Sequence, residues 1–220
     1  MTDNHAQKTT GPKLSTLKNQ PFKSVAVFCG SSPGRAPQHL ALATRLGTAI
    51  AERDLRLVYG GGGLGLMGAV ARAAHQNGGD VLGVIPELLC EAEALLPDIG
   101  HEIVPDMHTR KIRMYSEADA FIVLPGGIGT LEEAIEVLSW QRLNLHEKPI
   151  LFLSDTGFWD GLIAEFDRLI NEGFAGAAMA ADILRASSVD GAFDIIQERI
   201  DNPLTREPLI LRSATVETLA

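Results

Sequence analysis

A carboxylate and a guanidinium stand where both could act on one small anionic molecule. Glu133 comes one turn into a helical pattern that follows a glycine-rich turn at residues 125–129. Backbone N–H groups in such a turn approach a ligand closely, and the positive end of the new helix favours an anion. Arg110, in a run with Lys111 and Arg113, could hold a phosphate or carboxylate through two parallel hydrogen bonds. These residue types favour chemistry on a substrate that carries an anionic group.

Both side chains also have a structural interpretation. Thr130 and Glu133 have the spacing of a capping box, in which Thr130 accepts a hydrogen bond from the Glu133 N–H and Glu133 accepts one from the Thr130 N–H. The cations around Arg110 are equally typical of a solvated helix face. The segment alone therefore leaves two interpretations of Glu133 open, a cap or a cap combined with function.

Short apolar runs and helical periodicity alternate along the 220 residues. The apolar runs predict strands at residues 24–28, 56–59, 80–85, 101–104, 121–124, 149–153 and 183–186. The periodic segments predict helices at residues 37–53, 66–76, 107–118, 158–171 and 190–200, and one that starts at residue 129. This alternation predicts an α/β fold with a single doubly wound, Rossmann-like parallel sheet and helices on both faces. We expect the domain to span residues 21–201, between a flexible arm at residues 1–20 and a tail at residues 202–220.

Three of the predicted strands end in turns of small residues, at residues 29–34, 60–65 and 125–129. Ligands of doubly wound sheets bind at the carboxyl ends of the strands, so these turns could surround one nucleotide-sized ligand. Gly63, Gly65 and Gly68 also match the G-x-G-x-x-G pattern of dinucleotide sites. The acidic partner of that pattern would be Glu87 at best, and a solvated loop is the default interpretation of Glu87.

Composition and charge exclude several classes of function. A net charge of −9 and a pI near 5.1 argue against a nucleic-acid-binding surface. No apolar stretch is long enough to span a membrane, and the polar N-terminus lacks the core of a signal peptide. Cys29 and Cys90 cannot form a disulfide framework, and no Cys or His spacing is typical of a metal site. We therefore expect a cytoplasmic protein without a metal or cofactor.

The candidate site residues fit one reaction better than others. The chain has no G-x-S-x-G elbow for acyl transfer and no phosphate loop ending in Gly-Lys-Ser or Gly-Lys-Thr. Cleavage of the N-glycosidic bond of a nucleotide has an oxocarbenium-like transition state, which a carboxylate stabilises. Glu133 could stabilise the ribosyl cation or orient water, while Arg110 holds the substrate in line.

Two motifs match a known family. Residues 125–133, PGGIGTLEE, fit the signature P-G-G-x-G-T-x-x-E, and residues 107–111, MHTRK, fit the accompanying M-H-x-R-K. The chain resembles the Lonely guy family, the cytokinin riboside 5′-monophosphate phosphoribohydrolases, from about residue 24 to residue 200. Two long motifs in the correct order are specific for the family, though less so for one substrate.

The resemblance implies an N-glycosidase that hydrolyses a purine nucleoside 5′-monophosphate to the free base and ribose 5-phosphate. It further implies a homodimer in which Arg110 and Glu133 are the catalytic pair. The implied substrate-binding residues are Lys111, Gly126, Gly127, Ile128, Gly129, Thr130, Leu131 and Glu132, together with Ser31, Gly61 and Glu87.

Two other functions on the same scaffold remain alternatives. A nucleotide-binding or molybdenum cofactor carrier protein would not need Arg110 and Glu133 together, whereas a broad AMP nucleosidase would differ only in its substrate. Members of the family are often labelled lysine decarboxylases, but a pyridoxal enzyme requires a Schiff-base lysine. Four of the six lysines lie in the first 23 residues, and neither Lys111 nor Lys148 has a convincing pyridoxal context.

Overall fold

The computed structural model describes residues 22–204, which form a single α/β unit built around one sheet. The predicted arm at residues 1–20 and the predicted tail from residue 205 onward lie outside the described residues. The strands are β1 (Ser24–Phe28), β2 (Arg56–Tyr59), β3 (Val81–Pro86), β4 (Gly100–Val104), β5 (Ala120–Val123), β6 (Ile150–Leu153) and β7 (Ile183–Ala186). The helices are α1 (Pro37–Glu52), α2 (Gly65–Gln76), α3 (Met107–Glu117), α4 (Ile128–Arg142), α5 (Asp160–Asn171), α6 (Met179–Asp182) and α7 (Val189–Asp201).

The strands form one parallel sheet of seven in the order β4-β3-β2-β1-β5-β6-β7. This arrangement confirms the predicted doubly wound, Rossmann-like fold. Each predicted bound lies within two residues of the observed one. Sequence periodicity missed two short elements, α6 and the 3-10 helix η2 (Glu87–Leu89), because neither is long enough to show a repeat.

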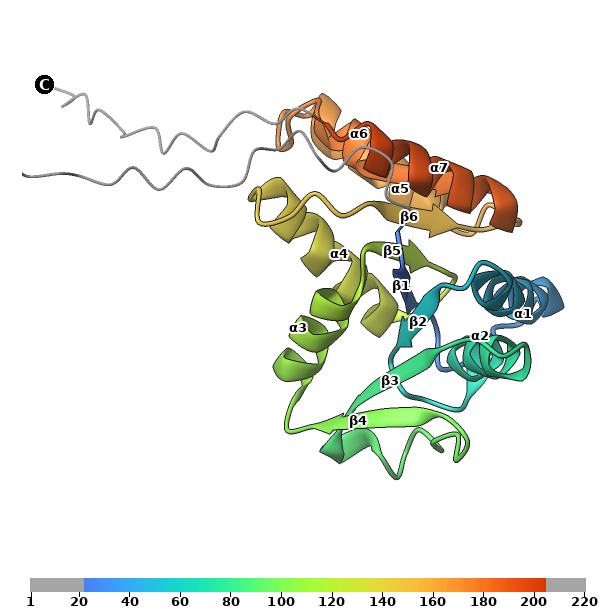
Figure 1. Cartoon of the computed structure of the whole chain (residues 1–220). Coiled ribbons are helices and arrows are strands. Elements are labelled where there is room, and N and C mark those ends of the chain that lie inside the picture. The colour runs from blue at the N-terminus through green and yellow to red at the C-terminus, as the bar shows by residue number, and fades with distance from the viewer. Residues whose placement is uncertain (1–21, 205–220) are drawn as a thin grey trace, which may run out of the picture.

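Helices cover both faces of the sheet (Figure 1). The side chains of α1, α2 and α7 pack into one core, and those of α3, α4 and α5 pack into the other. The central strand β1 supplies both cores, since Val25 and Val27 belong to the first and Ala26 and Phe28 to the second. Burial on both faces is the reason why the strands appear in the sequence as continuous apolar runs.

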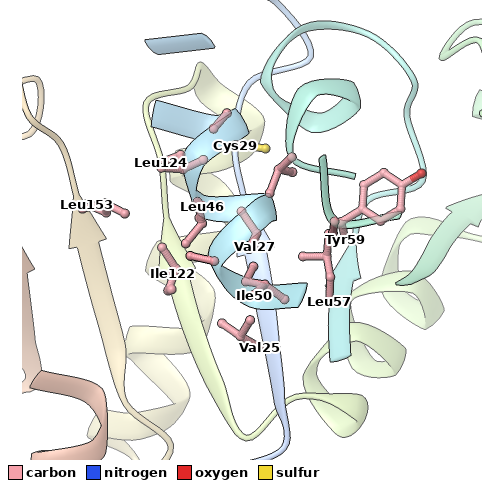
Figure 2. Close-up of a cluster of buried hydrophobic side chains, with 14 of the residues drawn as sticks. Val25, Val27, Cys29, Leu46, Ile50, Leu57, Tyr59, Ile122, Leu124 and Leu153 are labelled. Carbon is pink, nitrogen blue, oxygen red and sulfur yellow. The ribbon is translucent and has the colours of Figure 1, made fainter. Parts of the chain in front are cut away.

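Figure 2 shows the first core, where Leu46 and Ile50 of α1 lie over Val25 and Val27 of β1. All four side chains are 0% or 1% exposed. Such close packing fixes the carboxyl end of β1, where Cys29 closes the strand as a buried residue. The turn that follows Cys29 is therefore held in place against the sheet.

The direction of winding reverses between β1 and β5, which are paired in the centre of the sheet. After β1 the chain passes to α1 on one face, and after β5 it passes to α4 on the other. A crevice forms at the carboxyl ends of two strands that diverge in this way. Within residues 22–204, no helix is both long and apolar enough to cross a membrane.

Candidate active site

Arg110 of α3 and Glu133 of α4 meet in the interior of the protein. Nη1 of Arg110 donates a hydrogen bond of 2.6 Å to Oε1 of Glu133, and the two side chains are only 8% and 9% exposed. Nε of Arg110 donates to the Val84 carbonyl oxygen at 3.1 Å, which fixes the guanidinium against β3. The structure thus brings together the two side chains that the sequence analysis selected.

Burial and charge act in opposite directions on Glu133. Burial raises the pKa of the Glu133 carboxyl above its usual range, and the neighbouring Arg110 guanidinium opposes this rise. Burial likewise raises the pKa of the Cys29 thiol, which lies in the same cavity, so Cys29 is a protonated thiol at neutral pH. The contact with Arg110 at 2.6 Å thus favours the ionised form of the Glu133 carboxyl, against the effect of burial.

A glycine makes room for the guanidinium. A Cβ placed on Gly60 would lie 2.1 Å from Nη2 of Arg110 and 3.0 Å from Sδ of Met67. Any larger residue at this position would push the arginine away from Glu133. One function of the glycine-rich turn after β2 is thus to admit a buried arginine.

The other glycines of that turn pack against the protein itself. A Cβ on Gly63 would lie 2.0 Å from the Ala94 carbonyl oxygen, and one on Gly68 would lie 2.0 Å from the Gly63 carbonyl oxygen. Gly65 has a φ of +55° and abuts the backbone of Ser31. The G-x-G-x-x-G spacing therefore reflects close packing of backbone segments, and none of these three glycines lines the cavity.

The predicted capping box at Thr130 and Glu133 is wrong. Helix α4 begins at Ile128, so its N-cap is Gly127, three residues before the position that the box requires. Glu133 lies in the second turn and is drawn to Arg110 instead. Because Gly127 has no side chain to cap the helix, the N–H groups of the first turn are left to face the cavity.

A cavity of about 340 Å³ lies above the arginine and glutamate, and we call it the Arg110 cavity. The predicted site residues in its wall are Ser31, Arg110, Gly127, Ile128, Gly129, Thr130, Glu132 and Glu133. Its wall also contains Cys29, Gly30, Met67, Leu89, Glu93 and Met107, to which the sequence analysis assigned no ligand role. A second cavity of about 490 Å³ shares Gly30, Ser31 and Gly127 with it and extends toward His39 and Phe158.

Five predicted site residues lie outside the wall of the Arg110 cavity: Lys111, Gly61, Glu87, Gly126 and Leu131. Lys111 contacts Glu132 at 2.5 Å and Glu136 at 3.0 Å. Burial alone would lower the pKa of Lys111, but its hydrogen bonds to these two carboxylates raise it. Glu87 is exposed on η2, and Gly126 lines only the second cavity. Their roles in substrate binding stay predictions.

The residues missed by the sequence analysis come mostly from irregular connections. Glu93 and Leu89 belong to the segment between β3 and β4, whose acidic and leucine-rich composition resembles that of a solvated loop. Met107 was visible as the first residue of the M-H-x-R-K motif but was not selected as a ligand contact. Among residues 22–204, no group of three or more His, Cys, Asp or Glu residues could hold a metal ion.

Fold and site together define an α/β protein with a cavity at the switch point of its sheet. The start of α4, which has no side-chain cap, lines this cavity, and the buried pair of Arg110 and Glu133 lies beside it. This combination is typical of proteins that act on or bind nucleotides.

Comparisons with known proteins identify the family. The model of a family described as "Possible lysine decarboxylase" matches residues 67–197, more than half of the chain. A cytokinin riboside 5′-monophosphate phosphoribohydrolase of Arabidopsis thaliana is 48% identical over 70% of this chain and 71% of its own length. A protein of Oryza sativa subsp. japonica, named a probable enzyme of the same kind, is 42% identical over 83% of this chain and 74% of its own length. The chain therefore belongs to the family that this model describes, together with these relatives. The resemblance to the Lonely guy family is confirmed.

A solved structure shows the same fold. The molybdenum cofactor carrier protein of Chlamydomonas reinhardtii superposes with a TM-score of 0.59 over 80% of this chain and 96% of that chain. Its sequence is 21% identical, so this likeness establishes the architecture and carries no information about ligands.

Proposed function

We propose that the protein hydrolyses the N-glycosidic bond of a purine nucleoside 5′-monophosphate, releasing the free base and ribose 5-phosphate. The observation that carries this proposal is the buried Arg110 and Glu133 pair in a cavity whose wall includes the uncapped start of α4. The names of relatives at 42% and 48% identity support the same reaction.

Each part of the cavity has a role in this reaction. The N–H groups at Ile128, Gly129 and Thr130 bind the 5′-phosphate, since a helix start favours an anion. As the bond to the base breaks, positive charge develops on the ribose, and the Glu133 carboxylate stabilises it. A water molecule held by Glu133 adds to the anomeric carbon, and its proton ends on the nitrogen of the departing base. Arg110 holds Glu133 in place and contacts the substrate.

Product analysis tests the reaction directly. Incubation with AMP, or with isopentenyladenosine monophosphate, is expected to release free base and ribose 5-phosphate in equal amounts, measured by chromatography. Adenosine, which lacks the phosphate, is expected to be cleaved far more slowly, because binding energy at the helix start no longer contributes to catalysis. Binding of AMP without turnover would instead favour a carrier.

The alternative functions have weaker support. The carrier interpretation rests on a fold likeness at 21% identity, and a passive binder has no use for a buried acid and arginine beside its ligand. The description of the family as a lysine decarboxylase is also a poor match to the site. Lys111 contacts Glu132 and Glu136, Lys148 donates to the Tyr115 carbonyl oxygen, and neither lysine lines the cavity.

We propose that the protein is a homodimer and that it is located in the cytoplasm. Ile128 and Ile135 lie two turns apart on the same side of α4 and are 84% and 41% exposed, so a second copy could cover this apolar side. Cys29 and Cys90 are both free, as expected in a reducing compartment. Sedimentation equilibrium is expected to give twice the chain mass of 23.6 kDa, and a monomer mass would contradict the dimer.

A further inference from the structure

The second cavity, of about 490 Å³, opens beside the Arg110 cavity. The two cavities share Gly30, Ser31 and Gly127, so a group that is bound at the start of α4 lies at the boundary between them. This boundary is built from two turns that are joined by a hydrogen bond of 3.1 Å, which the Gly30 N–H donates to the Pro125 carbonyl oxygen. A ligand that extends past the start of α4 therefore enters the second cavity.

The wall of the second cavity contains a cation and no acid. Its described residues include Arg35 but no Asp or Glu, although the whole chain has a net charge of −9. The wall of the first cavity, in contrast, contains Glu93, Glu132 and Glu133. The Arg35 side chain is exposed, and no carboxylate within residues 22–204 pairs with it. The charge of Arg35 is therefore available to an anionic ligand.

His39 of α1 lines the second cavity and is only 9% exposed. Its Nδ1 is shielded from solvent, and no described residue supplies a hydrogen-bond partner for this nitrogen. The imidazole packs edge-on against Phe158 with ring centroids 5.6 Å apart, and a Cβ on Gly34 would lie 3.0 Å from its Cδ2. Buried polar groups are normally hydrogen-bonded, and the soft terminal torsion of histidine lets a nitrogen turn toward a ligand. The unpaired nitrogen therefore indicates a partner that a ligand supplies.

Helix α1 begins at the same cavity. Its first residue is Pro37, its N-cap Ala36 lines the cavity without a side-chain cap, and its first turn contains no acidic residue. The positive end of such a helix favours an anion. Ser31 and Ser32 line the cavity as well, and their hydroxyl groups can donate hydrogen bonds. The cavity thus combines several kinds of donor that bind a phosphate group.

We propose that the second cavity binds a phosphate group in addition to the 5′-phosphate of the substrate. This inference rests on the proposed function, which places the 5′-phosphate at the start of α4. Two sources provide the same chemistry: the β-phosphate of a nucleoside 5′-diphosphate, and inorganic phosphate that binds beside a nucleoside monophosphate. Two neighbouring phosphate groups repel each other, so the guanidinium of Arg35 is required to compensate the charge of the second one.

Calorimetric titrations at constant ionic strength distinguish the two sources. They use the full chain in the Glu133→Gln background, in which nucleotides persist. If the β-phosphate is the source, ADP is expected to bind about 10-fold to 100-fold more tightly than AMP. If inorganic phosphate is the source, ADP is expected to bind no more tightly than AMP, and inorganic phosphate is expected to bind saturably to AMP-saturated protein.

Variants of α1 and of the turn before it locate the second phosphate group. Arg35→Gln is expected to abolish whichever of the two signals is observed, while the dissociation constant for AMP stays within about threefold. His39→Phe, which keeps a ring against Phe158 but has no N–H, is expected to weaken the same signal. The matched control is Arg45→Gln, because Arg45 lies on α1 outside the cavity wall and pairs with Asp155 at 2.7 Å. This control is expected to keep the signal.

Three results would overturn the inference. The first is equal affinity for AMP and ADP together with no binding of inorganic phosphate to AMP-saturated protein. The second is a signal that Arg35→Gln leaves intact, and the third is an equal loss in Arg45→Gln, which would show a response to net charge alone. The proposed function fails separately, when protein that retains Glu133 releases no base from AMP, because the titrations still report on the second cavity in that case.

Discussion

Replacement of Glu133 by glutamine is expected to lower kcat by about 10²-fold to 10⁴-fold, the range found when a positioned acid or base is removed. Glutamine has nearly the same shape and can still accept the hydrogen bond of Arg110. It cannot carry the negative charge that stabilises the ribosyl cation or take a proton from water. The dissociation constant for AMP is expected to change little, because the phosphate is held at the start of α4.

Glu136→Gln is the matched control for this experiment. Glu136 lies on the same helix, contacts Lys111 at 3.0 Å and is outside the wall of the cavity. Its replacement removes one partly exposed ion pair and is expected to leave kcat within about threefold of the original value. Comparable loss in both variants would show that general disturbance of α4, and not the charge of Glu133, controls the rate.

The convergence of Arg110 and Glu133 was predictable because regular elements produce it. The helix that carries Arg110 precedes β5 and the helix that carries Glu133 follows it, and both pack on the same face of the sheet. Once apolar runs fix the strands and the parallel order, two helices that flank one strand in this way must lie close together. A local sequence signal was therefore enough to place both side chains at one edge.

The capping box failed because tertiary contacts override local preference. Thr130 and Glu133 fit the box by spacing, yet Gly127 starts the helix earlier and the Arg110 guanidinium attracts the Glu133 carboxylate. A capping bond involves only neighbouring residues, so its pattern is visible in any sequence. The arginine that competes for Glu133 is 23 residues away, and its distance in space cannot be known until the fold is built.

Glu93 could not be selected for a related reason. The segment between β3 and β4 has no periodicity, and its contacts with the glycine-rich turn include the hydrogen bond from the Gly63 N–H to the Glu93 carbonyl oxygen. Composition favoured a solvated loop, and Glu87, not Glu93, was the acid that a dinucleotide pattern would select. When an irregular segment lines a cavity, its packing against glycines that are distant in the sequence determines which of its side chains faces the cavity.

Replacement of Arg110 by methionine is expected to reduce stability as well as activity, by about 3–5 kcal/mol at neutral pH. The reason is that the buried Glu133 carboxylate loses the guanidinium at 2.6 Å that compensates its charge. Burial already raises the pKa of Glu133, and removal of Arg110 raises it further, because the arginine is the group that opposes this rise most strongly.

The sign of the pH dependence follows from that shift. A raised pKa in the folded state means that folded protein binds the proton more tightly than unfolded protein does. Folded Arg110→Met protein is then nearly as stable as the original below the unfolded pKa, near 4.5, where Glu133 is protonated in both states. Its free energy of unfolding falls as the pH rises from there to the raised folded pKa, beyond which the loss is complete. Denaturant titrations at a series of pH values measure this curve.

The double variant Arg110→Met with Glu133→Gln separates the two effects. With no carboxylate left to bury, most of the lost stability is expected to return, and the stability difference between the double variant and the original protein is expected to vary little with pH, while nucleotide cleavage stays as low as in the single variants. A stability loss in Arg110→Met that is the same at every pH, or that persists in the double variant, would mean that packing and the bond to Val84 matter more than charge. Arg110 would then act on Glu133 through position alone, and the proposal that its charge compensates the buried carboxylate would have to be abandoned.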